Sequence, residues 1–235
     1  MINIFDYFSN SEYPGRNITI GKMDDGSIFF CYGIMGRSAH SKNRVFVKED
    51  NILKTKAYDE SLLKDPTLII YNAVIPIENG FIVTNGDQSD TIDEFLSDKK
   101  SFEDALNTRE YEDDAPNYTP RISSLLKFKN EELDFLKLSI LKRGMEGVRR
   151  YYYNYEKIEK NTALIITTYS ENTNPLKSFY GEPIEVELPK TNDISELTKN
   201  IFEAQNDNNK ISLYGLKYTS NKEIEDIIIN INEDK

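Results

Sequence analysis

The stretch NITIGKMDDGSIFFCYGIMGRSAHSKNRVFVK, residues 17–48, indicates the fold class. It contains three short runs rich in β-branched and aromatic residues, and such runs are typical of strands when polar or glycine-containing turns separate them. We therefore predict strands at Asn17–Ile20, Ser27–Tyr32 and Arg44–Lys48. A chain with this pattern is expected to build its core mainly from sheets.

The same short, strand-like pattern continues through the rest of the chain. Alternation is clear where Leu136, Leu138 and Ile140 are separated by Lys137 and Ser139, because residues two apart share one face of a strand. Further strands are predicted at Leu68–Val74, Gly80–Thr84, Leu136–Leu141, Arg149–Tyr155, Ala163–Tyr169 and Ile211–Tyr218.

Two segments favour helices. The first is Asp90–Leu106, with Asp90 or Thr91 as its N-cap. A break in this segment is expected around Asp98–Ser101. The second is Asp193–Gln205, where apolar residues recur at helical spacing, whereas Ile224–Ile231 fits either a helix or a strand. Strand runs with isolated helices and no regular βαβ alternation predict an α+β fold. No repeat, low-complexity tract or linker divides residues 1–235, so we expect one domain.

Composition and charge narrow the class of protein. Hydrophobic residues make up 38% of 235, and 15 Tyr and 12 Phe without any Trp predict an aromatic, β-rich core. Cys31 is the only cysteine, so a reducing compartment is expected. No secretory signal and no apolar run of about 20 residues is found, which predicts a cytoplasmic protein without membrane contact. A net charge of −11 disfavours nucleic-acid binding but permits a small anionic ligand beside a local basic cluster.

The sequence lacks the residues that several common catalytic sites require. His40 is the only histidine, and it lies in a polar stretch that we interpret as a loop. Zinc sites need several His or Cys ligands, and neither a GxGxxG nor a GxxxxGK[ST] motif occurs. We therefore expect no metal and no cofactor, and chemistry carried by arginine, tyrosine, asparagine and carboxylates.

Four polar turns interrupt the strand-like runs. They are Tyr13–Arg16 (YPGR), Gly36–Arg44 (GRSAHSKNR), Thr84–Asp90 (TNGDQSD) and Pro116–Arg121 (PNYTPR). Arginine at a strand end can hold a phosphate through paired N–H donors, and a turn that precedes a helix offers free backbone N–H groups. Each turn alone also fits ordinary turn chemistry. Three arginine-bearing turns in an acidic chain together predict an anion pocket.

The same turns carry a resemblance to the archaeal-type IMP cyclohydrolase family. The similar segments, in unbroken order, are Ile20–Phe46, Ile69–Ala73 (IIYNA), Val83–Ile92 (VTNGDQSDTI), Tyr111–Ser123 (YEDDAPNYTPRIS) and Ile166–Pro183 (ITTYSENTNPLKSFYGEP). Two departures stand out. Gly33 follows Tyr32 where archaeal members have an arginine, and Tyr118 is inserted into their Asn-Thr-Pro-Arg element.

The resemblance implies a fold and a reaction. The fold is a four-layer αββα sandwich like that of the N-terminal-nucleophile hydrolases, although Met1 offers no such nucleophile. The reaction is the dehydrative closure of 5-formamidoimidazole-4-carboxamide ribonucleotide to IMP, with a purine ribonucleotide as the small-molecule partner. Two alternatives stay open: another nucleotide or amide hydrolase on this scaffold, which Gly33 favours, and a non-catalytic purine nucleotide-binding protein. The sequence does not fix the oligomeric state, and a homo-oligomer is compatible with it.

The resemblance also suggests the residues of a site. The expected catalytic residues are Tyr71 as hydrogen-bond donor, Glu112 as proton carrier, and Arg37, which with Arg44 binds a phosphate or an oxyanion. The expected substrate-binding residues are Arg16, Arg44, Asn72, Asn85, Asp87, Asn117, Thr119 and Arg121, the last as an orienting group. Core packing is the alternative for Tyr71, and a solvated face is the alternative for Glu112 in its acidic run.

Overall fold

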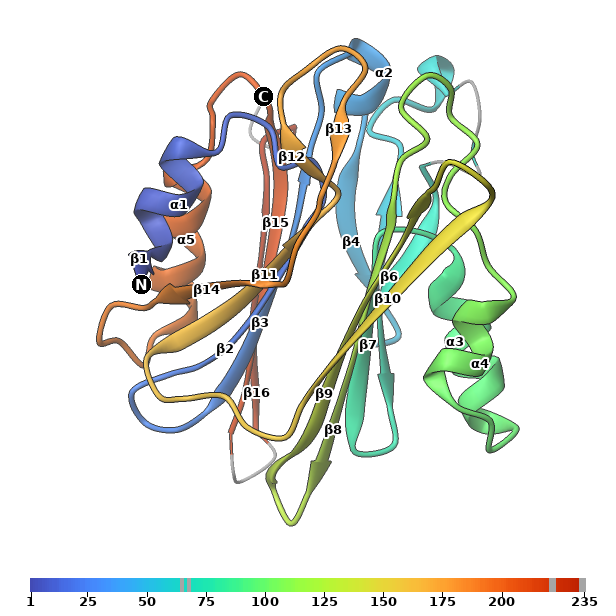
Figure 1. The fold of residues 1–235 in the computed structure, drawn as a ribbon. Coiled ribbons are helices and arrows are strands. Elements are labelled where there is room, and N and C mark those ends of the chain that lie inside the picture. The colour runs from blue at the N-terminus through green and yellow to red at the C-terminus, as the bar shows by residue number, and fades with distance from the viewer. Residues whose placement is uncertain (64–65, 67–68, 220–222, 233–235) are drawn as a thin grey trace.

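Two seven-stranded sheets lie face to face at the centre of the molecule (Figure 1). The computed structural model describes residues 1–63, 66, 69–219 and 223–232. Strands dominate this mixed α and β structure, as the sequence predicts. None of the helices among these residues is long and apolar enough to cross a membrane.

The first sheet brings together strands from both ends of the chain. Its order is β1 (Ile2–Asn3), β14 (Ile184–Glu187), β11 (Thr162–Thr167), β2 (Asn17–Lys22), β3 (Ile28–Met35), β15 (Lys210–Tyr218) and β16 (Ile224–Asn230). All neighbours pair antiparallel except β1 and β14.

The second sheet is a continuous antiparallel meander. Its order is β10 (Val148–Tyr155), β9 (Glu132–Arg143), β8 (Arg121–Lys129), β7 (Gly80–Thr84), β6 (Tyr71–Ile77), β5 (Ile52–Lys56) and β4 (Val45–Glu49). A small ribbon of β12 (Tyr169–Glu171) and β13 (Lys177–Ser178) stands apart from both sheets.

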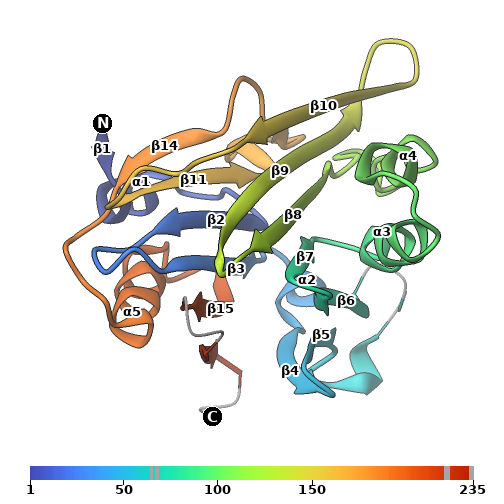
Figure 2. The ribbon, with the colours of Figure 1, turned by 90° about the horizontal axis from the view of Figure 1, so that it is seen from below.

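Helices cover the outer face of each sheet. Helices α1 (Ile4–Asn10) and α5 (Ile194–Ala204) pack on the first sheet, and α3 (Gln88–Ser97) and α4 (Phe102–Asn107) pack on the second. Figure 2 shows the two helix pairs on opposite sides of the molecule. The remaining helices are short: α2 (Ala39–Lys42) and a 3₁₀ turn at Glu60–Leu62.

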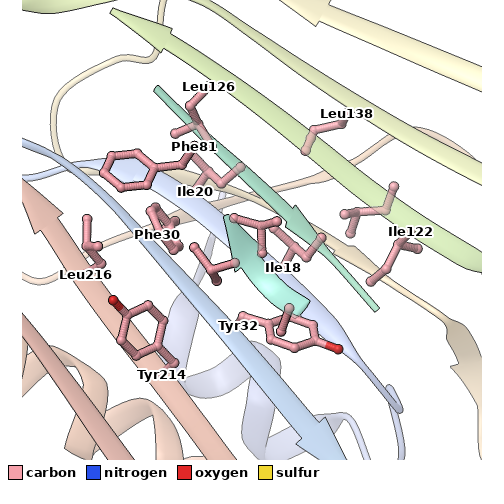
Figure 3. Packing of buried hydrophobic residues seen from close by; sticks show 14 of the residues in the cluster. Ile18, Ile20, Phe30, Tyr32, Phe81, Ile122, Leu126, Leu138, Tyr214 and Leu216 are labelled. Carbon is pink, nitrogen blue, oxygen red and sulfur yellow. The ribbon is translucent and has the colours of Figure 1, made fainter. Parts of the chain in front are cut away.

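The largest apolar cluster fills the space between the sheets (Figure 3). Ile18, Ile20 and Phe30 enter it from the first sheet, and Leu136 and Leu138 enter it from the second. Because side chains alternate along a strand, the intervening residues face the helices. The predicted alternation at residues 136–140 is confirmed, since Lys137 turns outward to bind Glu103 of α4 at 2.6 Å.

The helical predictions hold apart from the start of the first segment. The expected break at 98–101 separates α3 from α4, with Lys99 at a φ of 61° and Ser101 capping the second helix. The expected cap near Asp90 is wrong, because α3 begins at Gln88 after Asp87. The ambiguous segment after residue 223 is strand β16, because its partner β15 supplies a full ladder of hydrogen bonds.

The predicted strands are all present: Gly80–Thr84 has the predicted bounds, and the others have shifted ends. The largest difference concerns Leu68–Val74: Leu68 lies outside the described residues, Ile69 and Ile70 precede the strand, and β6 runs on to Ile77. Sequence patterns gave no bounds for the helices α1 and α2 or for the strands β1, β5, β8 and β12–β14, most of them too short to show a period.

Candidate active site

A cavity of about 310 Å³ lies at the end of the sheets that carries α2 and the β12–β13 ribbon. Its walls come from residues 13–16 before β2, residues 37–44 after β3, residues 112–119 before β8, and the ribbon residues Tyr169 and Leu176. Three of the four predicted turns therefore meet here. The fourth, Thr84–Asp90, does not line the cavity.

Arg16 and Glu112 form a buried ion pair in the cavity wall. The Nη2 atom of Arg16 lies 2.9 Å from one carboxylate oxygen of Glu112 and 3.1 Å from the other. Arg16 is held in place by its own backbone, because residues 14–16 exchange hydrogen bonds with Thr168 and Tyr169. Burial raises the pKa of Glu112 above its ordinary value, although the charge of Arg16 opposes the shift. The solvated-face interpretation of Glu112 is wrong, since the residue is 5% exposed.

Tyr32 and Tyr71 join their hydroxyl groups across the two sheets. The two oxygens are 2.7 Å apart, with Tyr32 on β3 and Tyr71 at the start of β6. Both rings belong to the apolar cluster between the sheets, so the core-packing interpretation of Tyr71 describes its ring. Its hydroxyl lies in the field of Arg16 and Arg44: burial raises the pKa of Tyr71, and these two charges oppose the rise.

A second wall of the cavity is aromatic. The ring of Tyr13 stacks on that of Tyr169, with centroids 5.9 Å apart, and the guanidinium of Arg37 lies 5.1 Å from the Tyr13 centroid. The Tyr169 hydroxyl contacts Thr119 Oγ1, which donates its own proton to Asp114. Thr119 is therefore fixed from both sides.

The three arginines of the cavity differ in exposure. Arg16 and Arg44 are buried, whereas Arg37 is exposed and donates to Asn172 Oδ1 at 2.8 Å and to the Thr173 carbonyl at 3.0 Å. Burial and the nearby charge of Arg16 both lower the pKa of Arg44, which indicates concentrated positive charge. Such a site favours an anionic ligand.

Five predicted residues do not line the cavity: Tyr71, described above, and Arg121, Asp87, Asn85 and Asn72. Arg121 donates to Gln88 Oε1 at 2.6 Å and pairs with Asp87 at 2.7 Å, where Asp87 also binds Arg109. Asn85 donates to the Pro120 carbonyl at 2.9 Å. Asn72 donates to Asp90 at 2.7 Å, since it faces away from its neighbour Tyr71. These groups tie α3 to the second sheet. The charge of Arg121 still lowers the pKa of Glu112, and among the charges that do so its effect is second to that of Arg16.

We expected Arg37, Arg44 and Arg121 to converge on one pocket. Arg37 and Arg44 line the cavity, but Arg121 does not, and the third arginine of the cavity is Arg16. Asn117 and Thr119 do line the cavity, and Asn117 Oδ1 accepts from the Leu176 N–H at 3.0 Å.

Neither departure from the archaeal pattern lies in the cavity wall. Gly33 lies opposite Asn17 on the face of the first sheet that α1 and α5 cover, and a Cβ there would meet the Asn17 amide at 2.7 Å. The inserted Tyr118 has a φ of 47°, and its ring packs against Tyr111 and lies, at its centroid, 3.8 Å from the guanidinium of Arg143. The residues before and after it still reach the cavity.

Sequence patterns missed several groups of the cavity. His40, interpreted as a loop residue, lies in α2 and lines the cavity beside Ser38 and Ser41. Tyr32, which bonds to Tyr71 and does not itself line the cavity, gives no local signal, because it lies in an apolar strand. Tyr169 and Asp114 lie within the segments similar to the family but have no distinguishing spacing. Among the described residues, no group of three or more His, Cys, Asp and Glu side chains could hold a metal ion.

Comparison with known proteins identifies the family. Residues 13–223 match the model of the IMP cyclohydrolase-like protein family. The IMP cyclohydrolase of Methanococcus maripaludis strain C7 is 30% identical over 76% of this chain and 92% of its own length. That of Methanosphaera stadtmanae is 29% identical over 81% of this chain and 85% of its own length. The chain belongs to the IMP cyclohydrolase-like family.

Proposed function

We propose that this protein is an IMP cyclohydrolase that closes 5-formamidoimidazole-4-carboxamide ribonucleotide to IMP with loss of water. The observation that carries the proposal is a cavity lined by Arg16, Arg44 and Glu112, with the hydroxyl of Tyr71, bonded to Tyr32, in the field of these charges. The relatives named IMP cyclohydrolase support it.

The reaction needs orientation and proton transfer. The carboxamide nitrogen attacks the formyl carbon, a C–N bond forms, and the nitrogen loses one proton while the formyl oxygen gains one. The resulting hydroxyl then leaves as water, taking up a second proton as the former formamide nitrogen loses its own and the ring double bond forms. Holding both groups in one molecule at contact distance supplies much of the rate. The remaining needs are a donor to the oxygen and a proton carrier.

The cavity residues, together with Tyr71 in the field of Arg16 and Arg44, offer a group for each need. Tyr71 donates to the formyl oxygen, and Glu112, whose pKa burial raises, carries the protons. Arg37 and Arg44 bind the phosphate, and Arg16 holds Glu112 in place. Asn117 and Thr119 contact the remaining polar groups of the nucleotide.

Besides Tyr71, four residues act from outside the cavity wall. Arg121 orients the site through its charge on Glu112, and Asp87 holds Arg121 in position. Asn85 and Asn72 complete the substrate-binding set by fixing the ends of β7 and β6 against β8 and α3.

The proposal extends to the whole chain. We assign the arrangement of two sheets with outer helices to the αββα sandwich of the N-terminal-nucleophile hydrolases. Residues 1–235 act as one domain, in the cytoplasm.

The direct test is incubation of the protein with the formamido ribonucleotide while IMP formation is followed by absorbance. We expect turnover by the wild type and its loss in Glu112→Gln, which keeps the shape of the side chain but cannot take up and release a proton. A matched control is Glu103→Gln, which also loses a carboxylate bound to a basic side chain, Lys137, but far from the cavity. Tight IMP binding without turnover by the wild type would refute the proposal in favour of a non-catalytic binding protein.

A further inference from the structure

We propose that Tyr32 is a positioning residue for the ring closure: its hydroxyl donates to Tyr71 and thereby directs the Tyr71 proton to the substrate. This inference rests on the proposed function, in which Tyr71 is the donor to the formyl oxygen. It concerns a residue that the sequence did not indicate.

The first step concerns the hydrogen bond of the Tyr32 hydroxyl, which has Tyr71 as its partner. Its side chain is fully buried, and within the described part of the chain its recorded hydrogen bond is the one to Tyr71 at 2.7 Å. Its ring is packed against Phe46, with centroids 5.5 Å apart. A hydroxyl enclosed in this way keeps its bond, because an unmade hydrogen bond in the core costs free energy.

The second step fixes the direction of that bond. Two hydroxyl groups share one proton between them, so either oxygen can be the donor. If Tyr71 donates to Tyr32, it has no proton left for the substrate. If Tyr32 donates, Tyr71 is free to donate onward, and successive hydrogen bonds in one direction strengthen each other.

The third step is that neither ring can swing away. Tyr71 opens strand β6, and its backbone N–H donates to Thr55 Oγ1 at 3.1 Å. Tyr32 lies within β3, paired on both sides by β2 and β15. The pair therefore presents a preorganised donor, which is the arrangement that stabilises developing negative charge most effectively.

The experiment compares Tyr32→Phe with Tyr214→Phe. Tyr214 of β15 lies directly opposite Tyr32 of β3, and its ring enters the same core. Its hydroxyl donates to Asp226 at 2.9 Å, and neither residue lines the cavity. We expect Tyr32→Phe to lower kcat by roughly 10- to 100-fold with little change in KM, below the 10²–10³ of a direct donor. Tyr214→Phe is expected to retain kcat, and thermal melts place both variants on one stability scale.

The decisive variant is the double substitution. Because Tyr32 acts only through Tyr71, Tyr32→Phe combined with Tyr71→Phe should be no slower than Tyr71→Phe alone. A normal kcat in Tyr32→Phe, equal losses in Tyr32→Phe and Tyr214→Phe, or additive losses in the double variant would each overturn the inference while the wild type still makes IMP. A wild type that makes no IMP overturns the proposed function, and the inference falls with it.

Discussion

Removal of the Arg16 guanidinium is expected to destabilise the protein in a pH-dependent manner. In Arg16→Met the aliphatic part of the side chain is kept, and Glu112 stays buried without its charge partner. Breaking a buried ion pair from one side costs about 3–5 kcal/mol, because the remaining charge has lost its solvent and its counterion. The two side chains are 8% and 5% exposed, so solvent screening does not reduce this figure much.

The pH dependence follows from Glu112. Burial already raises its pKa in the folded protein, and Arg16 is the largest opposing influence, so its loss raises that pKa further. A group with a raised folded pKa stabilises the protein below its unfolded value, about 4.3, and this stability is lost as the pH rises through the folded pKa. The cost of Arg16→Met should therefore be small near pH 4.5 and full at pH 8.

Urea unfolding of the wild type and the variant from pH 4.5 to 8.5 measures this cost. Lys100→Met is a matched control, because Lys100 pairs with Asp98 at 3.1 Å on the surface, where such pairs contribute at most about 1 kcal/mol. The reasoning is refuted if Arg16→Met costs less than about 1 kcal/mol at pH 8, or if its cost does not change with pH.

Three further outcomes are expected. Arg37→Ala should cost the fold about 1 kcal/mol or less, since Arg37 is exposed, but about 2–4 kcal/mol of transition-state stabilisation, with partial rescue by Arg37→Lys in steady-state kinetics; an activity loss that only follows the melting temperature would count against a ligand contact. Turnover should survive EDTA, because dehydrative closure by Tyr71 and Glu112 needs no Lewis acid, and loss on chelation that a divalent ion restores would contradict this mechanism. Gly15→Ala should lower stability by roughly 1–3 kcal/mol in urea melts, because Gly15 has a φ of 74° and a Cβ would approach Thr168 Oγ1 to 2.3 Å; an unchanged midpoint would show that the turn relaxes.

The sequence by itself determined the local structure. Apolar residues spaced two apart predict strands, and those spaced three to four apart predict helices. These spacings are visible in the sequence for the strands, for the helical segment that breaks at Lys99 and for α5. It also marked the turns that carry Arg16, Arg37 and Arg44, because polar residues that interrupt apolar runs are visible without any fold.

Only the tertiary structure decided which of those turns meet. Tyr71 and Asn72 are neighbours in the chain, yet Tyr71 enters the core between the sheets, where it bonds to Tyr32, and Asn72 bonds to Asp90 of α3. Arg121 could not be told from Arg16 by its surroundings in the sequence, but the start of α3 places Asp87 against it. The Tyr32–Tyr71 pair joins two sheets across 39 residues of chain. Such contacts depend on how two separate sheets stack and in what register, and a local pattern contains no record of either.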